Sequence, residues 1–133
     1  MDEMIESVGI DLVEVKRIEK ILKKWGEKFT GRVFSEGEII YCGKKAYPSI
    51  HYAARFAVKE AFLKCLGVGI GGGIALKDIE VHNNDDGRPE LHLHRNAKHI
   101  LKDRGITGTY VSISHTDHYA TAIVVFERGF ESK

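Results

Sequence analysis

The end of the chain constrains the fold most, because two strand-like segments lie there with only four residues between them. Thr109–Ser114 and Tyr119–Phe126 have the alternating character of strands, and His115-Thr116-Asp117-His118 joins them. This pattern predicts an antiparallel hairpin. Any fold of this chain therefore contains an antiparallel sheet built around its C-terminal part.

The rest of the chain supplies elements marked by apolar spacing and by residues typical of their ends. We predict strands at Ile5–Leu12, Asp78–His82 and Glu90–His94. We predict helices at Val15–Trp25, from Ser35 to about Cys42, at Pro48–Leu66 and around Ala97–Arg104. Ser35 and Glu38 fit a capping box, and Gly26 and Gly67 stand at expected helix stops. The order β-α-α-α-β-β-α-β-β predicts one α+β domain over residues 1–133, with helices on one face of an antiparallel sheet.

Charge and apolar content exclude several classes of protein. The chain has 20 Lys and Arg residues and 19 Asp and Glu residues. Because the net charge is only +1, it gives no overall attraction to nucleic acid or membranes. The longest apolar run, 122–126, is too short to span a bilayer, and the acidic start lacks a signal peptide's apolar stretch. Cys42 and Cys65 form no CxxC motif or disulfide framework, which indicates buried thiols in a reduced compartment. We expect a cytoplasmic protein.

Asp11 is the first candidate functional residue, because it is a carboxylate at the end of an apolar strand. It follows Val8-Gly9-Ile10 and precedes Leu12-Val13. A buried carboxylate needs a cation, a metal ion or hydrogen-bond donors to offset the loss of water. The alternative is structural, since Asp is a favoured N-cap and a helix begins just after it.

Glu60 is the second candidate, because helical spacing places it on one stripe with Phe56 and Leu63. That stripe faces the predicted core. Lys64 follows one turn later, and an intrahelical Glu60–Lys64 pair is the structural alternative. Together with Asp11, Glu60 offers two carboxylate ligands on separate elements, a set that suits Mg²⁺ beside substrate phosphates.

Three further motifs allow more than one interpretation. The glycine-rich segment Gly67–Gly73 matches neither a P-loop nor a dinucleotide fingerprint, and it is either a flexible connection or a ligand-facing loop. Ser112-Ile113-Ser114-His115 ends a strand at a hairpin tip, so a hydroxyl and the imidazole should be exposed together as phosphate donors or as a plain turn. His92 and His94 share a sheet face, either as surface residues or as metal ligands.

The first predicted helix has a basic side formed by Lys16, Arg17, Lys20, Lys23 and Lys24. Such a side is either a solvated face or a surface that receives an acidic partner or nucleic acid. Few aromatic residues are interleaved with these lysines, which argues against stacking on single-stranded bases.

Two motifs resemble one known family. Gly9-Ile10-Asp11-Leu12-Val13-Glu14-Val15-Lys16-Arg17 resembles the N-terminal signature of the holo-acyl-carrier-protein synthases, the small 4′-phosphopantetheinyl transferases. Phe56-Ala57-Val58-Lys59-Glu60-Ala61, continuing through Lys64 to Gly67, is similar to their second signature. Phe34-Ser35-Glu36-Gly37-Glu38, the loop Gly67–Gly73 and Ser112–His115 also match, so the resemblance covers nearly the whole chain in order.

The resemblance implies the 4′-phosphopantetheinyl transferase fold, in subunits that trimerise, and transfer of phosphopantetheine from coenzyme A to a serine of acyl carrier protein in support of fatty acid biosynthesis. By position, Asp11 and Glu60 would bind Mg²⁺, and Glu60, directly or through a metal-bound water, would take the serine proton. Lys64 would neutralise coenzyme phosphate oxygens. Arg55 and His115 would contact the phosphates or ribose of coenzyme A.

The resemblance also gives the basic side of the first helix a partner. Arg17, Lys20 and Lys24 would receive the acidic recognition helix of acyl carrier protein. Surface charges of this kind mainly raise the association rate, and their effect weakens with salt.

Two alternative functions are also compatible with the sequence. A non-catalytic module could bind an acidic protein or RNA through the basic helix and would need neither Asp11, Glu60 nor a divalent ion. A Mg²⁺-dependent phosphohydrolase would keep both carboxylates but would release free phosphate without an acceptor protein.

Overall fold

The computed structural model describes residues 3–70 and 72–129, and it has an α+β architecture. The N-terminal half contains β1 (Glu3–Glu14), α1 (Val15–Trp25), α2 (Glu27–Val33), α3 (Glu36–Gly43) and α4 (Pro48–Leu66). The C-terminal half contains the short 3₁₀ helix η1 (Leu76–Asp78), β2 (Ile79–Asn83), β3 (Pro89–Leu93), α5 (Arg95–Asp103), β4 (Gly108–His115) and β5 (Tyr119–Gly129). Met1, Asp2 and Gly71, on which parts of the sequence interpretation fall, lie outside the described residues.

The strands form two antiparallel sheets, whereas a single sheet was predicted. One sheet has three strands in the order β1-β5-β4, and the other pairs β2 with β3. The chain leaves β3 through Arg95, whose φ of 50° is positive, and enters α5 before it reaches β4. β3 contacts β4 but is not paired with it in one sheet, and neither apolar alternation nor strand length reveals which neighbouring strands pair.

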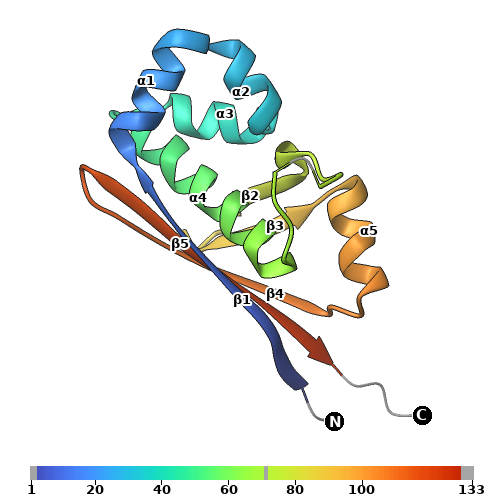
Figure 1. Cartoon of the computed structure of the whole chain (residues 1–133). Coiled ribbons are helices and arrows are strands. Elements are labelled where there is room, and N and C mark those ends of the chain that lie inside the picture. The colour runs from blue at the N-terminus through green and yellow to red at the C-terminus, as the bar shows by residue number, and fades with distance from the viewer. Residues whose placement is uncertain (1–2, 71, 130–133) are drawn as a thin grey trace.

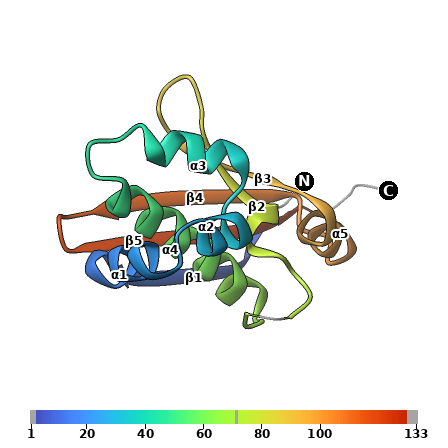
Figure 2. The same cartoon turned by 90° about the horizontal axis from the view of Figure 1, so that it is seen from above.

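Helix α4 is the central element of the molecule. It lies across one face of the three-stranded sheet and packs on β1 and β5, and α1, α2 and α3 lie on the same side (Figures 1 and 2). Its ends are those predicted, because Pro48 occupies its first turn and Gly67, in the left-handed conformation at φ 80°, follows its last residue. The capping box of α3, Ser35 with Glu38, is also present.

The segment after Gly26 differs from the prediction. Gly26 does end α1, as expected, with a positive φ of 49°, but the chain immediately starts the seven-residue helix α2. A helix this short has little periodicity to detect, and it is held by packing of Thr30 and Val33 into the core.

The face of the three-stranded sheet opposite α4 carries exposed apolar side chains. Val8, Ile10 and Leu12 of β1 are 51%, 61% and 65% exposed, and Ile123 of β5 lies beside Ile10 in register. Figure 1 shows no helix over this side of the sheet. Within residues 3–70 and 72–129, no helix combines the length and apolar character needed to cross a membrane.

Candidate functional site

The structure brings Asp11 of β1 beside Lys64 of α4, although 53 positions separate them in the sequence. The Lys64 Nζ atom donates to Asp11 Oδ1 at 2.8 Å and to the backbone oxygen of Ile10 at 3.1 Å. Glu60 lies one turn before Lys64 on α4. The two signature motifs therefore meet where β1 crosses the helix.

A glycine allows this close crossing. Residues 9, 11 and 13 of β1 point toward α4, because alternate residues of a strand share a face. A Cβ atom on Gly9 would lie 2.0 Å from the backbone oxygen of Ala61 and 2.7 Å from the backbone nitrogen of Cys65. Only a residue without a side chain fits there, so Gly9 sets the approach that places Asp11 next to Lys64.

The structural alternatives for Asp11 and Lys64 are wrong. β1 continues to Glu14, which is the N-cap residue of α1, so Asp11 lies inside the strand and does not cap the helix. The Lys64 ammonium makes its ion pair with Asp11 and not with Glu60. The first outcome depends on the strand extending past Leu12, which the apolar pattern did not reveal, and the second depends on the close crossing at Gly9.

Glu60 sits at the edge of the core, where its carboxylate is partly shielded from water. Burial raises the pKa of Glu60 above its ordinary value, and the negative charge of Asp11 raises that pKa further. The positive charges of Lys64 and Arg17 act in the opposite direction. Asp11 and Glu60 are thus close enough to repel each other electrostatically.

Two carboxylates in this relation fit a divalent cation. A cation held between them would relieve the repulsion that raises the pKa of Glu60, and Mg²⁺ commonly takes one or two carboxylates together with water and substrate phosphates. Among the residues that the structure describes, no group of three or more His, Cys, Asp or Glu side chains is arranged to hold a metal ion. The imidazoles of His92 and His94 are exposed and contact Glu90 and Glu80 respectively.

A second cluster surrounds Arg55, which is buried on α4. Its Nη2 atom donates to Asn83 Oδ1 at 2.8 Å, and its guanidinium lies 3.9 Å from the ring centroid of Tyr41. The Tyr41 ring contacts His51 at 6.0 Å between centroids, and His51 contacts His115 at 5.8 Å. The sequence interpretation identified Arg55 and His115, and the structure adds the aromatic and amide groups that connect them.

This cluster borders a cavity and concentrates positive charge. The cavity is about 270 Å³ and is lined by Gly37, Tyr41, Arg55, Val81, His82 and Asn83. Burial lowers the pKa of His51, and the charges of Lys45, His115 and Arg55 lower it further. Arg55 Nε is the buried side-chain nitrogen that lacks a hydrogen-bond partner within the described residues. A donor of this kind beside a cationic cavity suits an anionic ligand.

The hydroxyls and the imidazole at the end of β4 are exposed but do not act together. Ser112 and Ser114 lie on the outer face of the sheet, whereas His115 has the opposite parity and contacts His51 of α4. The predicted exposure of a hydroxyl and the imidazole is confirmed, since Ser114 and His115 are both exposed, but strand alternation places them on opposite faces of the sheet. Of the glycine-rich segment, Gly67 and Gly73 have positive φ, which agrees with either interpretation of that loop.

The predicted basic surface is present on α1. Arg17, Lys20 and Lys24 are exposed, and their spacing places them on one side of the helix. Residues that the sequence interpretation missed are Tyr41, His51 and Asn83. The only sequence signal for them was the spacing of His51 and Arg55, four residues apart on α4.

The comparisons with known proteins show the family of the chain. The profile of the 4′-phosphopantetheinyl transferase superfamily matches residues 7–124. The chain therefore belongs to that superfamily.

Within the superfamily, the similar proteins share one description. The chain is 57% identical, over 93% of its length and 97% of the relative, to a holo-[acyl-carrier-protein] synthase of Syntrophus aciditrophicus. A holo-[acyl-carrier-protein] synthase of Neisseria meningitidis has a similar structure, with a TM-score of 0.85, 33% identity, and coverage of 92% of this chain and 98% of that one. The Helicobacter pylori holo-[acyl-carrier-protein] synthase, solved in complex with coenzyme A, has a TM-score of 0.79 and 36% sequence identity. The match covers 90% of this chain and 98% of that one.

Proposed function

We propose that this protein transfers 4′-phosphopantetheine from coenzyme A to a serine hydroxyl of acyl carrier protein. The serine oxygen attacks the phosphorus that bears pantetheine, the bond to the bridging pyrophosphate oxygen breaks, and adenosine 3′,5′-bisphosphate leaves. The observation that carries this proposal is the meeting of Asp11, Glu60 and Lys64 at one crossing of β1 and α4. The similarity to proteins named holo-[acyl-carrier-protein] synthase supports this proposal.

The residues of the crossing have separate roles in this reaction. Glu60 accepts the serine proton directly or through a metal-bound water molecule. Lys64 is half exposed and shifts from Asp11 toward phosphate oxygens of coenzyme A. Arg55 and His115 bind phosphate or ribose groups of the nucleotide half, where the Arg55 Nε proton gains an acceptor.

Asp11 and Glu60 are the residues that would hold Mg²⁺. When bound, the ion supplies neutralisation of charge on the pyrophosphate and on the leaving phosphate. The repulsion between the two carboxylates supports this assignment, because their oxygens are the hard ligands that Mg²⁺ takes.

Arg17, Lys20 and Lys24 of α1 form the docking surface for acyl carrier protein in this proposal. Their exposed positive charges suit an acidic helix. We expect the KM for the carrier to rise with ionic strength and with Arg17→Ala, because screening and charge removal both slow association.

We further propose that three copies assemble through the exposed apolar face of Val8, Ile10 and Leu12, and that coenzyme A binds between subunits. The support is the exposure of these side chains on a face that the single chain leaves bare. Light scattering after size exclusion tests the assembly, and a monomeric mass that persists at high protein concentration would contradict it. Two free buried thiols, Cys42 and Cys65, agree with work in the cytoplasm, where the holo carrier would serve fatty acid biosynthesis.

The decisive experiment combines the protein with coenzyme A, Mg²⁺ and apo acyl carrier protein, and then measures the mass of the carrier. We expect a gain of one phosphopantetheine that EDTA and Glu60→Gln abolish. Glu19→Gln, an exposed glutamate on α1, is the matched control and should leave the gain intact. Release of free phosphate without carrier modification would favour a phosphohydrolase, and carrier binding without any reaction would favour a non-catalytic module.

A further inference from the structure

Lys59 is a signature residue for which the proposed reaction has no role. It directly precedes Glu60, yet its side chain is 0% exposed and points away from the Asp11 crossing into the interior. An ammonium group in the core is costly unless its donors are all used. The contacts of Lys59 therefore show what the group is for.

The Lys59 Nζ atom joins three separate elements to α4. It donates to Glu38 Oε1 of α3 at 2.8 Å, to the backbone oxygen of Leu76 in η1 at 3.0 Å and to that of Ile79 in β2 at 2.6 Å. An ammonium has three protons, so all of them are used. Burial lowers the pKa of Lys59, while the charge of Glu38 opposes that change.

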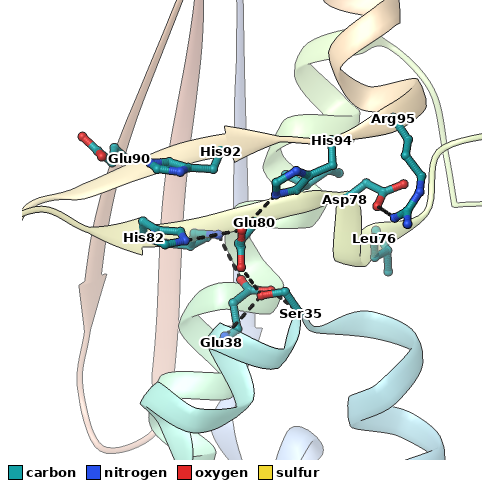
Figure 3. Close-up of polar contacts among 12 residues, drawn as sticks. Ser35, Glu38, Leu76, Asp78, Glu80, His82, Glu90, His92, His94 and Arg95 are labelled. Atoms are coloured by element: carbon teal, nitrogen blue, oxygen red, sulfur yellow. Dashed lines mark hydrogen bonds and ion pairs between the residues drawn. The ribbon is translucent and has the colours of Figure 1, made fainter.

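The partner carboxylate is equally satisfied. Besides Lys59, Glu38 accepts from the backbone nitrogen of Ser35 at 2.9 Å and, through Oε2, from that of Val81 at 3.1 Å. Figure 3 shows Glu38 below the β2–β3 pair, with Glu80 between it and His94. The pair therefore fixes α3 and β2 against α4 through bonds at both of its ends.

The elements fixed by this pair are those that carry the partners of Arg55. Tyr41, which stacks under the guanidinium, belongs to α3, and Asn83, which accepts from Nη2, belongs to β2. Arg55 itself lies one helical turn before Lys59 on α4. A shift of α3 along α4 would therefore change the Tyr41 contact of Arg55, and a shift of β2 would change the Asn83 contact.

We propose that Lys59, through its buried pair with Glu38, is a positioning residue that sets the Arg55 wall of the coenzyme A site. This inference rests on the proposed role of Arg55. Loss of the pair weakens coenzyme A binding while the Asp11–Glu60–Lys64 crossing on the opposite side of the helix keeps its geometry. The expected signature is a raised KM for coenzyme A at nearly unchanged kcat. A purely structural role would lower the active fraction, and thus the apparent kcat, at unchanged KM.

The test uses E38Q/K59M, which removes both charges and nearly keeps the side-chain volumes. We expect the KM and the calorimetric dissociation constant for coenzyme A to rise roughly tenfold, the effect of misaligning one charged hydrogen bond. The KM for the carrier should stay the same. D78N/R95M is the control, because it removes another ion pair of a buried carboxylate, at 3.0 Å, which joins η1 to α5.

Arg55→Met separates this inference from the proposal on which it depends. If Arg55→Met raises the KM for coenzyme A but E38Q/K59M does not, Lys59 is structural only and the inference fails alone. If Arg55→Met also leaves the KM unchanged, the assigned role of Arg55 fails. Should E38Q/K59M not fold, Lys59→Arg, which keeps a cation beside Glu38 but changes the geometry of the bonds to Leu76 and Ile79, must show a rise in KM, and an unchanged KM there overturns the inference.

Discussion

Helix α4 carries two lysine–carboxylate pairs that are alike in distance and opposite in surroundings. Lys59–Glu38 and Lys64–Asp11 are each 2.8 Å long, but the side chains of the first pair are 0% exposed and those of the second are 56% and 17% exposed. Water reaches the second pair and is excluded from the first. The two pairs therefore serve different purposes on one helix.

The two ion pairs differ in the free-energy cost of losing one partner. In the interior, losing one member leaves the other charge unpaired in a medium that solvates it poorly, so the Lys59–Glu38 pair stays fixed. At the surface, water replaces the lost partner, and the pair contributes little to stability. Lys64 and Asp11 can consequently turn to ligands, whereas Lys59 and Glu38 cannot.

The largest effect is expected from breaking the buried pair on one side. Lys59→Met should lower the free energy of unfolding by about 3–5 kcal/mol, because it leaves the Glu38 carboxylate buried without its cation. Urea unfolding followed by circular dichroism measures this loss. E38Q/K59M should recover most of it, and a loss below about 1 kcal/mol in Lys59→Met would mean that the two pairs do not differ.

The next effect concerns the crossing that creates the exposed pair. Gly9→Ala should destabilise the protein by about 1–3 kcal/mol, because the new Cβ atom overlaps the backbone of Ala61 and forces β1 away from α4. Gly31→Ala is the control, since nothing lies within 4 Å of its Cβ position on α2, and it should stabilise by up to about 1 kcal/mol. Equal stability of Gly9→Ala and the parent in thermal unfolding would refute the close approach.

Removing the exposed lysine should have a smaller effect on stability. Lys64→Met should change the free energy of unfolding by less than about 1 kcal/mol, because Asp11 remains accessible to water and salt. The measurement is urea unfolding under the conditions used for Lys59→Met. A loss as large as that of Lys59→Met would show that exposure does not separate the two pairs.

The smallest effect is a pH dependence at Glu60. Its raised pKa means that the folded protein holds this proton more tightly than the unfolded chain, so stability falls as pH rises from the ordinary value of 4.5 through the folded pKa. Glu60→Gln removes that penalty. The variant should be more stable than the parent at pH 8, and the difference should vanish below pH 4.5, as thermal unfolding across pH would show. A pH-independent difference would contradict the raised pKa.

Much of the fold followed from local signals in the sequence. The ends of α4 and the capping box of α3 were predicted because Pro48, Gly67, Ser35 and Glu38 act within a few residues of themselves. The division into two sheets and the helix α2 were missed, since they depend on which distant elements pack together.

The same division holds for the candidate site. Asp11, Glu60 and Lys64 are charges in apolar surroundings and in two recognisable motifs, so the sequence alone indicates their chemistry. The sequence does not predict that Lys64 pairs with Asp11 and not with Glu60. That pairing depends on the close approach of β1 to α4, which Gly9 permits.

Residue order by itself determined the helix ends, the strand pattern, the family and the set of charged groups available for chemistry, because each depends on neighbours along the chain. Only the tertiary structure decided that Lys59 is buried and that Lys64 is exposed to water. Lys59 is buried because α3, η1 and β2 pack over its side of α4. Exclusion of solvent therefore depends on the packing of elements that are distant in the sequence.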